Sequence, residues 1–108
     1  MLHEKARLGI LTALHGRPDG ILFTDLKELC SLTDGNLSRH VSVLQEAGLV
    51  QVWKGYQGRR PQTLIRMTAL GRSQFLAYLA ELEQVIHDAK QAHRPKKSWE
   101  APPGWMPA

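Results

Sequence analysis

Apolar and polar residues alternate along this 108-residue chain with the period of an amphipathic helix in some stretches and of a strand in others. Residues 3–15 predict a first helix, with one apolar stripe for the core and a second stripe that contains Leu8 and Leu11. Glycine and proline in residues 16–20 predict a loop. The apolar run 21–23 is then either a brief strand or chain directed into the core.

Two short helices separated by a turn follow in the pattern. We expect Thr24 to cap the first of them, which runs through Cys30, and Thr33 to cap the second, which runs to about Ala47. Gly48 stands where a glycine commonly ends a helix. The second helix has a core-facing stripe that consists of Leu37, Val41 and Leu44.

Two strand-like segments and a long helix complete the pattern. Residues 49–54 and 62–68 predict the strands of a hairpin, and the glycines and proline between them place an exposed tip at 55–61. Thr68 predicts the N-cap of a last helix over about 69–91. One face of that helix carries apolar residues at steps of four, three and four, namely Phe75, Leu79, Leu82 and Ile86.

The order helix, helix, helix, hairpin, helix predicts a mainly α fold with a small β-hairpin wing. This is a winged helix-turn-helix, here with a long C-terminal helix suited to dimerisation. A chain of this length has room for one domain, which we place at residues 1–91. The tail at 92–108 is basic and contains proline and tryptophan. Its cations Arg94, Lys96 and Lys97 either contact a DNA backbone or only add solubility.

The polar face of the third helix has side chains that suit DNA reading. Arginine pairs with guanine, asparagine and glutamine pair with adenine, and short hydroxyls reach phosphates or base edges. Apart from Gln45, these side chains occupy the first half of the helix, the end that normally enters a major groove: Asn36, Ser38, Arg39 and Ser42. Because any amphipathic helix shows a polar face to solvent, the helix alone leaves both interpretations open.

The hairpin tip favours DNA contact. Arg59 and Arg60 lie on a protrusion with little apolar content, where they can contact a phosphate backbone or enter a minor groove. Tyr56 can add a hydrogen bond to a phosphate, and Lys54 a more distant charge. The chain has a net charge of +4, and the five cations and one anion of segment 36–66 give the same excess. The positive charge is therefore local.

The sequence gives little support to other function classes. No apolar run approaches the roughly 18–20 residues that span a bilayer, and the start has no secretory pattern. With its single cysteine, Cys30, the chain is therefore expected to be cytoplasmic and without membrane contact. We interpret Cys30 as a core residue rather than a redox sensor, and Trp53 as structural. No catalytic constellation, phosphate-binding loop or metal-ligand spacing is recognisable, so we expect no enzyme, cofactor or metal.

Several motifs resemble those of the MarR/ArsR-like winged-helix regulators, and more closely those of the short single-domain winged helix DNA-binding group of bacterial and archaeal regulators. Around the third helix these are LTDGNLSRHV at 32–41 and LQEAGLV at 44–50. At the hairpin and the start of the last helix they are GRRPQT at 58–63 and TALGR at 68–72. The resemblance covers roughly residues 3–90. It implies duplex DNA binding by a homodimer that is formed by the first and last helices, with one recognition helix and one wing per half-site.

These observations define the candidate sites. The expected DNA contacts are Thr33, Asn36, Ser38, Arg39, His40, Ser42, Lys54, Tyr56, Arg59 and Arg60. His40 is expected either to pack at the edge of the recognition helix or to touch a phosphate. The expected dimer interface consists of Leu8, Leu11, Phe75, Leu79, Leu82 and Ile86.

A surplus of apolar surface supports the dimer independently of the resemblance. A last helix of about 23 residues is roughly 34 Å long, which is more than so small a domain needs to cover its own core. Both stripes of the first helix could instead serve one core. For the function as a whole, the alternative to DNA binding is a winged helix that binds another protein through its hairpin or its tail.

Overall fold

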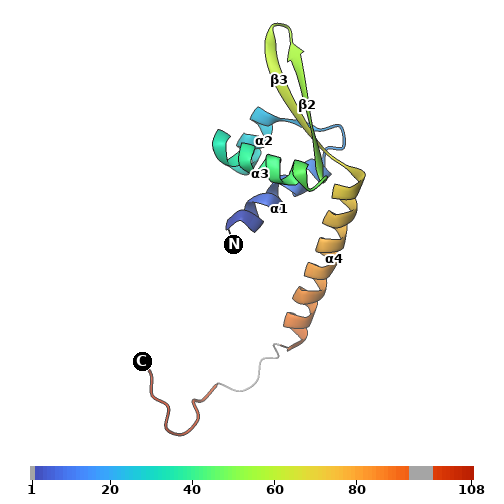
Figure 1. Cartoon of the computed structure of the whole chain (residues 1–108). Helices are drawn as coiled ribbons and strands as arrows, with labels where there is room; N and C mark the ends of the chain where they lie inside the picture. The colour runs from blue at the N-terminus through green and yellow to red at the C-terminus, as the bar shows by residue number, and fades with distance from the viewer. Residues whose placement is uncertain (1, 93–98) are drawn as a thin grey trace. The chain divides into compact units, whose positions relative to one another are not determined.

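The computed structural model describes residues 2–92 and 99–108 (Figure 1). These residues form α1 Leu2–His15, β1 Ile21–Leu22, α2 Phe23–Cys30, α3 Asp34–Glu46, β2 Val50–Gln57, β3 Arg60–Met67 and α4 Ala69–Ala92. The predicted winged helix-turn-helix architecture is confirmed, and the run 21–23 divides into a short strand and the first residue of α2. The predicted limit between domain and tail at residue 91 stays a prediction. Arg94, Lys96 and Lys97 lie outside the described residues.

The chain divides into two compact units. The first extends to Tyr78 and holds the three strands, α1 to α3 and the first turns of α4; the second is Leu79–Ala108. In the second unit, the described tail segment 99–108 contains a turn in which the N–H of Trp105 donates to the carbonyl of Pro102 at 3.2 Å. Within the described ranges, no helix combines the length and the apolarity needed to cross a membrane.

The hydrophobic core of the first unit joins the helix-turn-helix to the wing. The three antiparallel strands have the order β1-β3-β2, and Ile65 of the central strand pairs with Ile21 on one side and Val52 on the other. The largest fully buried side chains come from α1, α2, α3 and β3, and are Ile10, Leu14, Leu26, Leu37 and Ile65. Because these side chains come from helices and sheet alike, the core fixes the wing relative to α3.

The helix α2 begins without the predicted cap. Thr24 was expected to be its N-cap, but α2 begins at Phe23, and the capping position is held by Leu22, whose side chain makes no capping hydrogen bond. The prediction was wrong because Leu22 is still paired with β3, so the chain passes from sheet to helix with no residue between them. At the other end, Ser31 has a left-handed backbone with φ of 54°, and this makes the sharp turn towards α3.

The helix α3 has the ends that the sequence predicts. Thr33 Oγ1 accepts a hydrogen bond from the backbone N–H of Asn36 at 3.2 Å, which confirms Thr33 as the N-cap. Gly48 follows the helix with φ of 78°. The N–H groups of Gly48 and Leu49 both donate back to carbonyls of the last turn at 2.9 Å. Both ends of α3 are thus closed by local hydrogen bonds.

The wing is longer, and its tip shorter, than predicted. Strands β2 and β3 pair along their full lengths, so Gln57 lies opposite Arg60 and only Gly58 and Arg59 form the turn. Gly58 has φ of 66°, which fits a two-residue hairpin with glycine at its first position. The expected loop at 55–61 was wrong because its glycines and proline are compatible with cross-strand pairing.

The start of α4 is bonded to the start of the wing. Thr68 Oγ1 accepts a hydrogen bond from the N–H of Gly71 at 2.9 Å, which confirms the predicted cap, and its hydroxyl donates to the carbonyl of Gly48 at 2.7 Å. The N–H of Thr68 donates to the carbonyl of Leu49 at 3.0 Å. Gly71 lies so close that an added Cβ would overlap with the same Leu49 carbonyl. The first turn of α4 therefore packs directly on backbone.

We expect Gly71→Ala to destabilise the fold by about 1–3 kcal/mol, because α4 would have to move away from Leu49 to admit a methyl group. Urea unfolding followed by circular dichroism measures the change. Gly9→Ala in α1 is the matched control, since an added Cβ there meets nothing within 4 Å. Equal stability of the two variants would contradict the close packing of α4 on this carbonyl.

Candidate nucleic-acid interface

The helix α3 turns one face to the core and the other to solvent. Leu37, Val41 and Leu44 are buried, as predicted. The polar residues that were expected to read DNA from this helix, except His40, are all exposed: Asn36, Ser38, Arg39 and Ser42. Thr33 is exposed as well. Because its oxygen already accepts the capping bond, Thr33 has its O–H to offer to a ligand.

His40 belongs to the buried face of α3. Its side chain is only 6% exposed, and it lies one residue before Val41 in the buried stripe. Of the two positions that the sequence left open, packing against the helix is the one found. A contact between the His40 side chain and a phosphate or base stays a prediction, for which the ring has little exposed surface.

An ion pair joins the two helices of the helix-turn-helix. Lys27 Nζ of α2 lies 2.9 Å from Asp34 Oδ1 at the first position of α3. The carboxylate is well placed there for the positive end of the helix. Because Lys27 is paired with it, Asp34 would repel a phosphate less at the end of α3 that carries the exposed polar side chains.

A groove separates α3 from the base of the wing. It has a volume of about 580 Å³. Its polar lining comes from α3 on one side and from the wing on the other: Ser38, Ser42, Gln45, Lys54 and Thr63. Lys54 Nζ donates to Thr63 Oγ1 across the two strands at 3.3 Å, which holds the ammonium group on this side of the wing. Among the residues that the structure describes, none that lines the groove is acidic.

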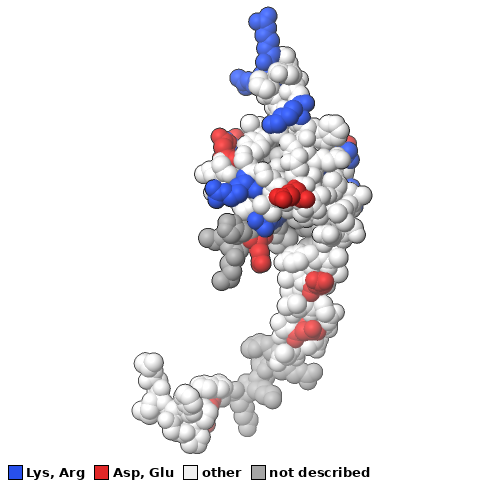
Figure 2. All heavy atoms as spheres, viewed as in Figure 1, with Lys and Arg blue, Asp and Glu red and all other residues white. Residues whose placement is uncertain are grey.

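The wing carries basic residues and no acidic ones from Gln51 to Arg66. Figure 2 shows Lys and Arg atoms along the projecting wing and the visible Asp and Glu atoms elsewhere. Arg59 in the turn and Arg60 at the start of β3 are exposed. Tyr56 is 78% exposed and, two residues after Lys54 on the same strand, lies on the same face of the ribbon. The groove surface thus continues outward along the wing.

Trp53 was expected to be a structural residue beside the core, and the structure contradicts this. Its side chain is 54% exposed on the wing, where Nε1 donates to Gln51 Oε1 at 3.3 Å. The prediction failed because strand alternation places Trp53 on the face opposite to Val52 and Lys54. Trp53 therefore lies outside the groove beside α3.

Sequence reasoning missed Thr63 as a member of the groove. Thr63 lies opposite Lys54 in the hairpin register. A two-residue turn at Gly58 and Arg59 would have identified this pair, because the register of a hairpin follows from its turn. With a seven-residue tip expected at 55–61, the register was not determined, so Thr63 was not recognised as the partner of Lys54.

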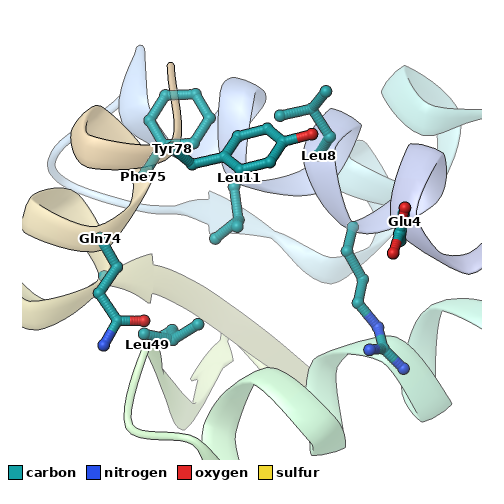
Figure 3. Close-up of a pocket in the computed structure, with 9 residues that line it drawn as sticks. Glu4, Leu8, Leu11, Leu49, Gln74, Phe75 and Tyr78 are labelled. Carbon is teal, nitrogen blue, oxygen red and sulfur yellow. The ribbon is translucent and has the colours of Figure 1, made fainter. Parts of the chain in front are cut away.

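The residues expected at a dimer interface divide into two groups. Leu8 and Leu11 of α1 line a hollow of about 300 Å³ together with Phe75 and Tyr78 of α4. Figure 3 shows the Tyr78 ring reaching from α4 towards the α1 side chains. Phe75 is nevertheless buried, and its ring centroid lies 5.2 Å from that of His15. Phe75 therefore packs in the core of its own chain, and its expected place at a dimer interface stays a prediction.

Further along α4, in the second unit, apolar side chains are open to solvent. Ile86 is 46% exposed, and Leu79 and Leu82 are half-buried. Val85, which the sequence pattern did not single out, is also exposed. A second copy of the chain could cover these side chains.

Cys30 is half-buried, and burial raises the pKa of its thiol. A raised pKa keeps the thiol protonated at neutral pH, which disfavours the reactive thiolate of a redox sensor. In the part of the chain that the structure describes, no three His, Cys, Asp or Glu side chains gather as a metal-ligand set.

Comparisons with known proteins agree with this geometry. A family model described as "Winged helix DNA-binding domain" matches residues 6–86. An uncharacterized protein of Methanocaldococcus jannaschii is 39% identical over 85 residues, which cover 79% of this chain and 91% of that protein. The structure of a transcriptional regulator homologue from Pyrococcus horikoshii OT3 is similar at a TM-score of 0.72 with 34% identity, over 77% of this chain and 81% of that one.

A MarR family transcriptional regulator from Silicibacter pomeroyi has the same fold. It superposes with a TM-score of 0.59 at 24% identity, over 79% of this chain and 55% of that one. At this identity the likeness concerns the fold alone. The shared fold is the winged helix that the sequence pattern predicts.

Proposed function

This chain belongs to the winged helix DNA-binding domain family, and we propose that it is a sequence-specific regulator of transcription that binds duplex DNA as a homodimer. In each subunit α3 enters the major groove, and the basic wing contacts the backbone or the minor groove. The observation that carries the proposal is the groove between α3 and the wing. Hydroxyl and amide groups line one side of it and Lys54 the other, and no acidic residue of the described chain lies between them.

The contacts divide by chemistry. On α3, Arg39 can donate two hydrogen bonds to guanine, and Asn36 can pair with adenine. On the wing, Arg59 and Arg60 are exposed cations on a narrow ribbon, so they suit phosphates or a minor groove better than a fixed base edge. The hydroxyls of Ser38 and Ser42 can add hydrogen bonds close to α3, and the hydroxyl of Tyr56 can add one further from its backbone.

Exposed apolar surface supports the homodimer. The hollow beside Leu8 and Leu11 is open, and α4 presents Leu82 and Ile86 at the spacing of one helical face. Apolar surface arranged as a stripe on a long helix is typical of an interface between identical subunits. A dimer also doubles the number of phosphate contacts, of which one small domain can make only a few.

We expect duplex affinity to fall steeply with salt, and Arg59→Ala and Arg60→Ala each to lower the slope of log K against log salt by about one. Fluorescence anisotropy with a labelled duplex measures the slope. Arg17→Ala is the matched control, because Arg17 lies in a hollow with Asp25 and Glu28 rather than on the wing.

A chain that binds no duplex even at low salt would contradict the proposed function. That result would favour the alternative, a winged helix that binds another protein. Wing variants that bind with the slope of the unmodified chain would instead show that the wing does not neutralise phosphates.

We expect Arg39→Ala to lose about 1–3 kcal/mol of binding free energy at a specific site, because a bidentate contact with one base would be lost. The site is obtained by selecting bound duplexes from a random pool with the unmodified protein. The spacing of its half-sites reports the geometry of the dimer. An equal loss on selected and unselected duplexes would make Arg39 a phosphate contact instead.

We expect Ile86→Lys to weaken self-association at least tenfold, because dimerisation would bury an unpaired ammonium group. Sedimentation equilibrium measures the dissociation constant. Gln84→Lys adds the same charge to another face of α4, where Gln84 Nε2 donates to Asp88 Oδ1 at 2.9 Å. A monomeric unmodified chain, or equal association of the two variants, would contradict the role of this apolar face.

A further inference from the structure

Gly35, the second residue of α3, has no role in the fold that would require a glycine. It is exposed, its φ lies outside the left-handed region, and an added Cβ would meet nothing within 4 Å. Glycine is less favourable than alanine within a helix. Gly48 and Gly71 differ, since the first needs a positive φ and the second has a carbonyl against it.

Gly35 lies at the middle of the face that α3 turns away from the core. At 100° per residue, Gly35 falls on one line with Arg39 and Ser42, opposite the buried stripe of Leu37 and Leu44. This line begins at the helix end that normally enters a major groove. A ligand that approaches the exposed face of α3 would therefore contact Gly35 in the first turn.

The side chains around Gly35 leave this position open. Thr33 bends back to accept the N–H of Asn36, and Asp34 is paired with Lys27 of α2. Apart from its two chain neighbours and the backbone of its own helix, nothing in the described protein comes within 4 Å of a Cβ at position 35. The backbone at Gly35 is thus open to an approaching ligand.

Two other outward residues of α3 can contact bases only if the helix lies close to them. Ser38 and Ser42 are exposed, and their hydroxyls extend only a short way from the helix. Hydrogen bonds form in a narrow range of distances, with heavy atoms about 2.5–3.2 Å apart. Short side chains can therefore reach base edges directly only if the helix backbone itself lies deep in the groove.

We propose that Gly35 is the point of closest approach between α3 and the base edges of the major groove, and that it determines specificity by allowing the helix to lie deep enough for Ser38, Arg39 and Ser42 to reach the bases. This inference rests on the proposed function. A methyl group at position 35 would project by about 1.5 Å and hold the helix away from the bases, which would lengthen every short contact at once.

The test is Gly35→Ala in the full chain, with the duplex that the unmodified protein selects from a random pool and with an unrelated duplex at the same salt. We expect the melting temperature to rise by about 2–6 °C, because alanine favours the helix. Affinity for the selected duplex should fall about tenfold or more, the scale of one lost base contact. Affinity for the unrelated duplex should change less than about threefold, because phosphate contacts carry that binding.

Two further variants sharpen the test. Gly35→Leu keeps a good helix former and adds bulk, so its loss on the selected duplex should exceed that of Gly35→Ala. Gly9→Ala is the matched control, since Gly9 is also an exposed helical glycine with nothing within 4 Å of an added Cβ. We expect this control to raise the melting temperature without changing either affinity.

The outcomes separate this inference from the proposed function. An unmodified chain that selects no duplex overturns the proposed function, and the inference with it. Specific binding by the unmodified chain that survives Gly35→Ala and Gly35→Leu unchanged overturns the inference alone. A melting temperature lowered by Gly35→Ala, or equal losses on both duplexes, overturns it too, because the glycine would then serve folding or a phosphate contact.

Discussion

The first turn of α4 packs closely on the backbone of Gly48 and Leu49, which follow α3. The rest of this fold depends on that constraint. Thr68 is bonded at once to Gly48, Leu49 and Gly71, and Gly71 leaves no room for a side chain against Leu49. The end of the recognition helix, both ends of the wing and the start of the last helix therefore meet within one small cluster. A shift of any one of these elements would break hydrogen bonds of the others.

This cluster explains why α3 and the wing can form one surface. A groove between a helix and a two-stranded ribbon keeps its shape only if the angle between them is fixed. Here the hydrogen bonds at Thr68 fix the angle at one end, and the shared core around Ile65 fixes it from beneath. The polar groups on the two walls then act together: hydroxyls and amides on the helix side, and Lys54, positioned by Thr63, on the wing side.

The parts of the structure that the sequence predicts are those decided by neighbours in the chain. The caps at Thr33 and Thr68 and the left-handed glycine after α3 depend on residues a few positions away, so they could be identified. Thr24 failed because pairing between strands distant in sequence decided where α2 begins. Trp53 failed for a similar reason, since the face that a strand residue takes depends on elements that a single segment does not reveal.

The two-residue turn at the end of the wing has a consequence for how such a protein can change. In the described part of the chain, β1 pairs with β3 only at Leu64 and Ile65, so from Thr63 to the tip the ribbon is held by its own pairing. One residue added to each strand next to the turn would move the tip outward by about 3.4 Å and to the other face of the ribbon. Two added to each strand would restore the original face. Wing length can therefore vary between related chains in paired steps, with the core and the recognition helix left as they are.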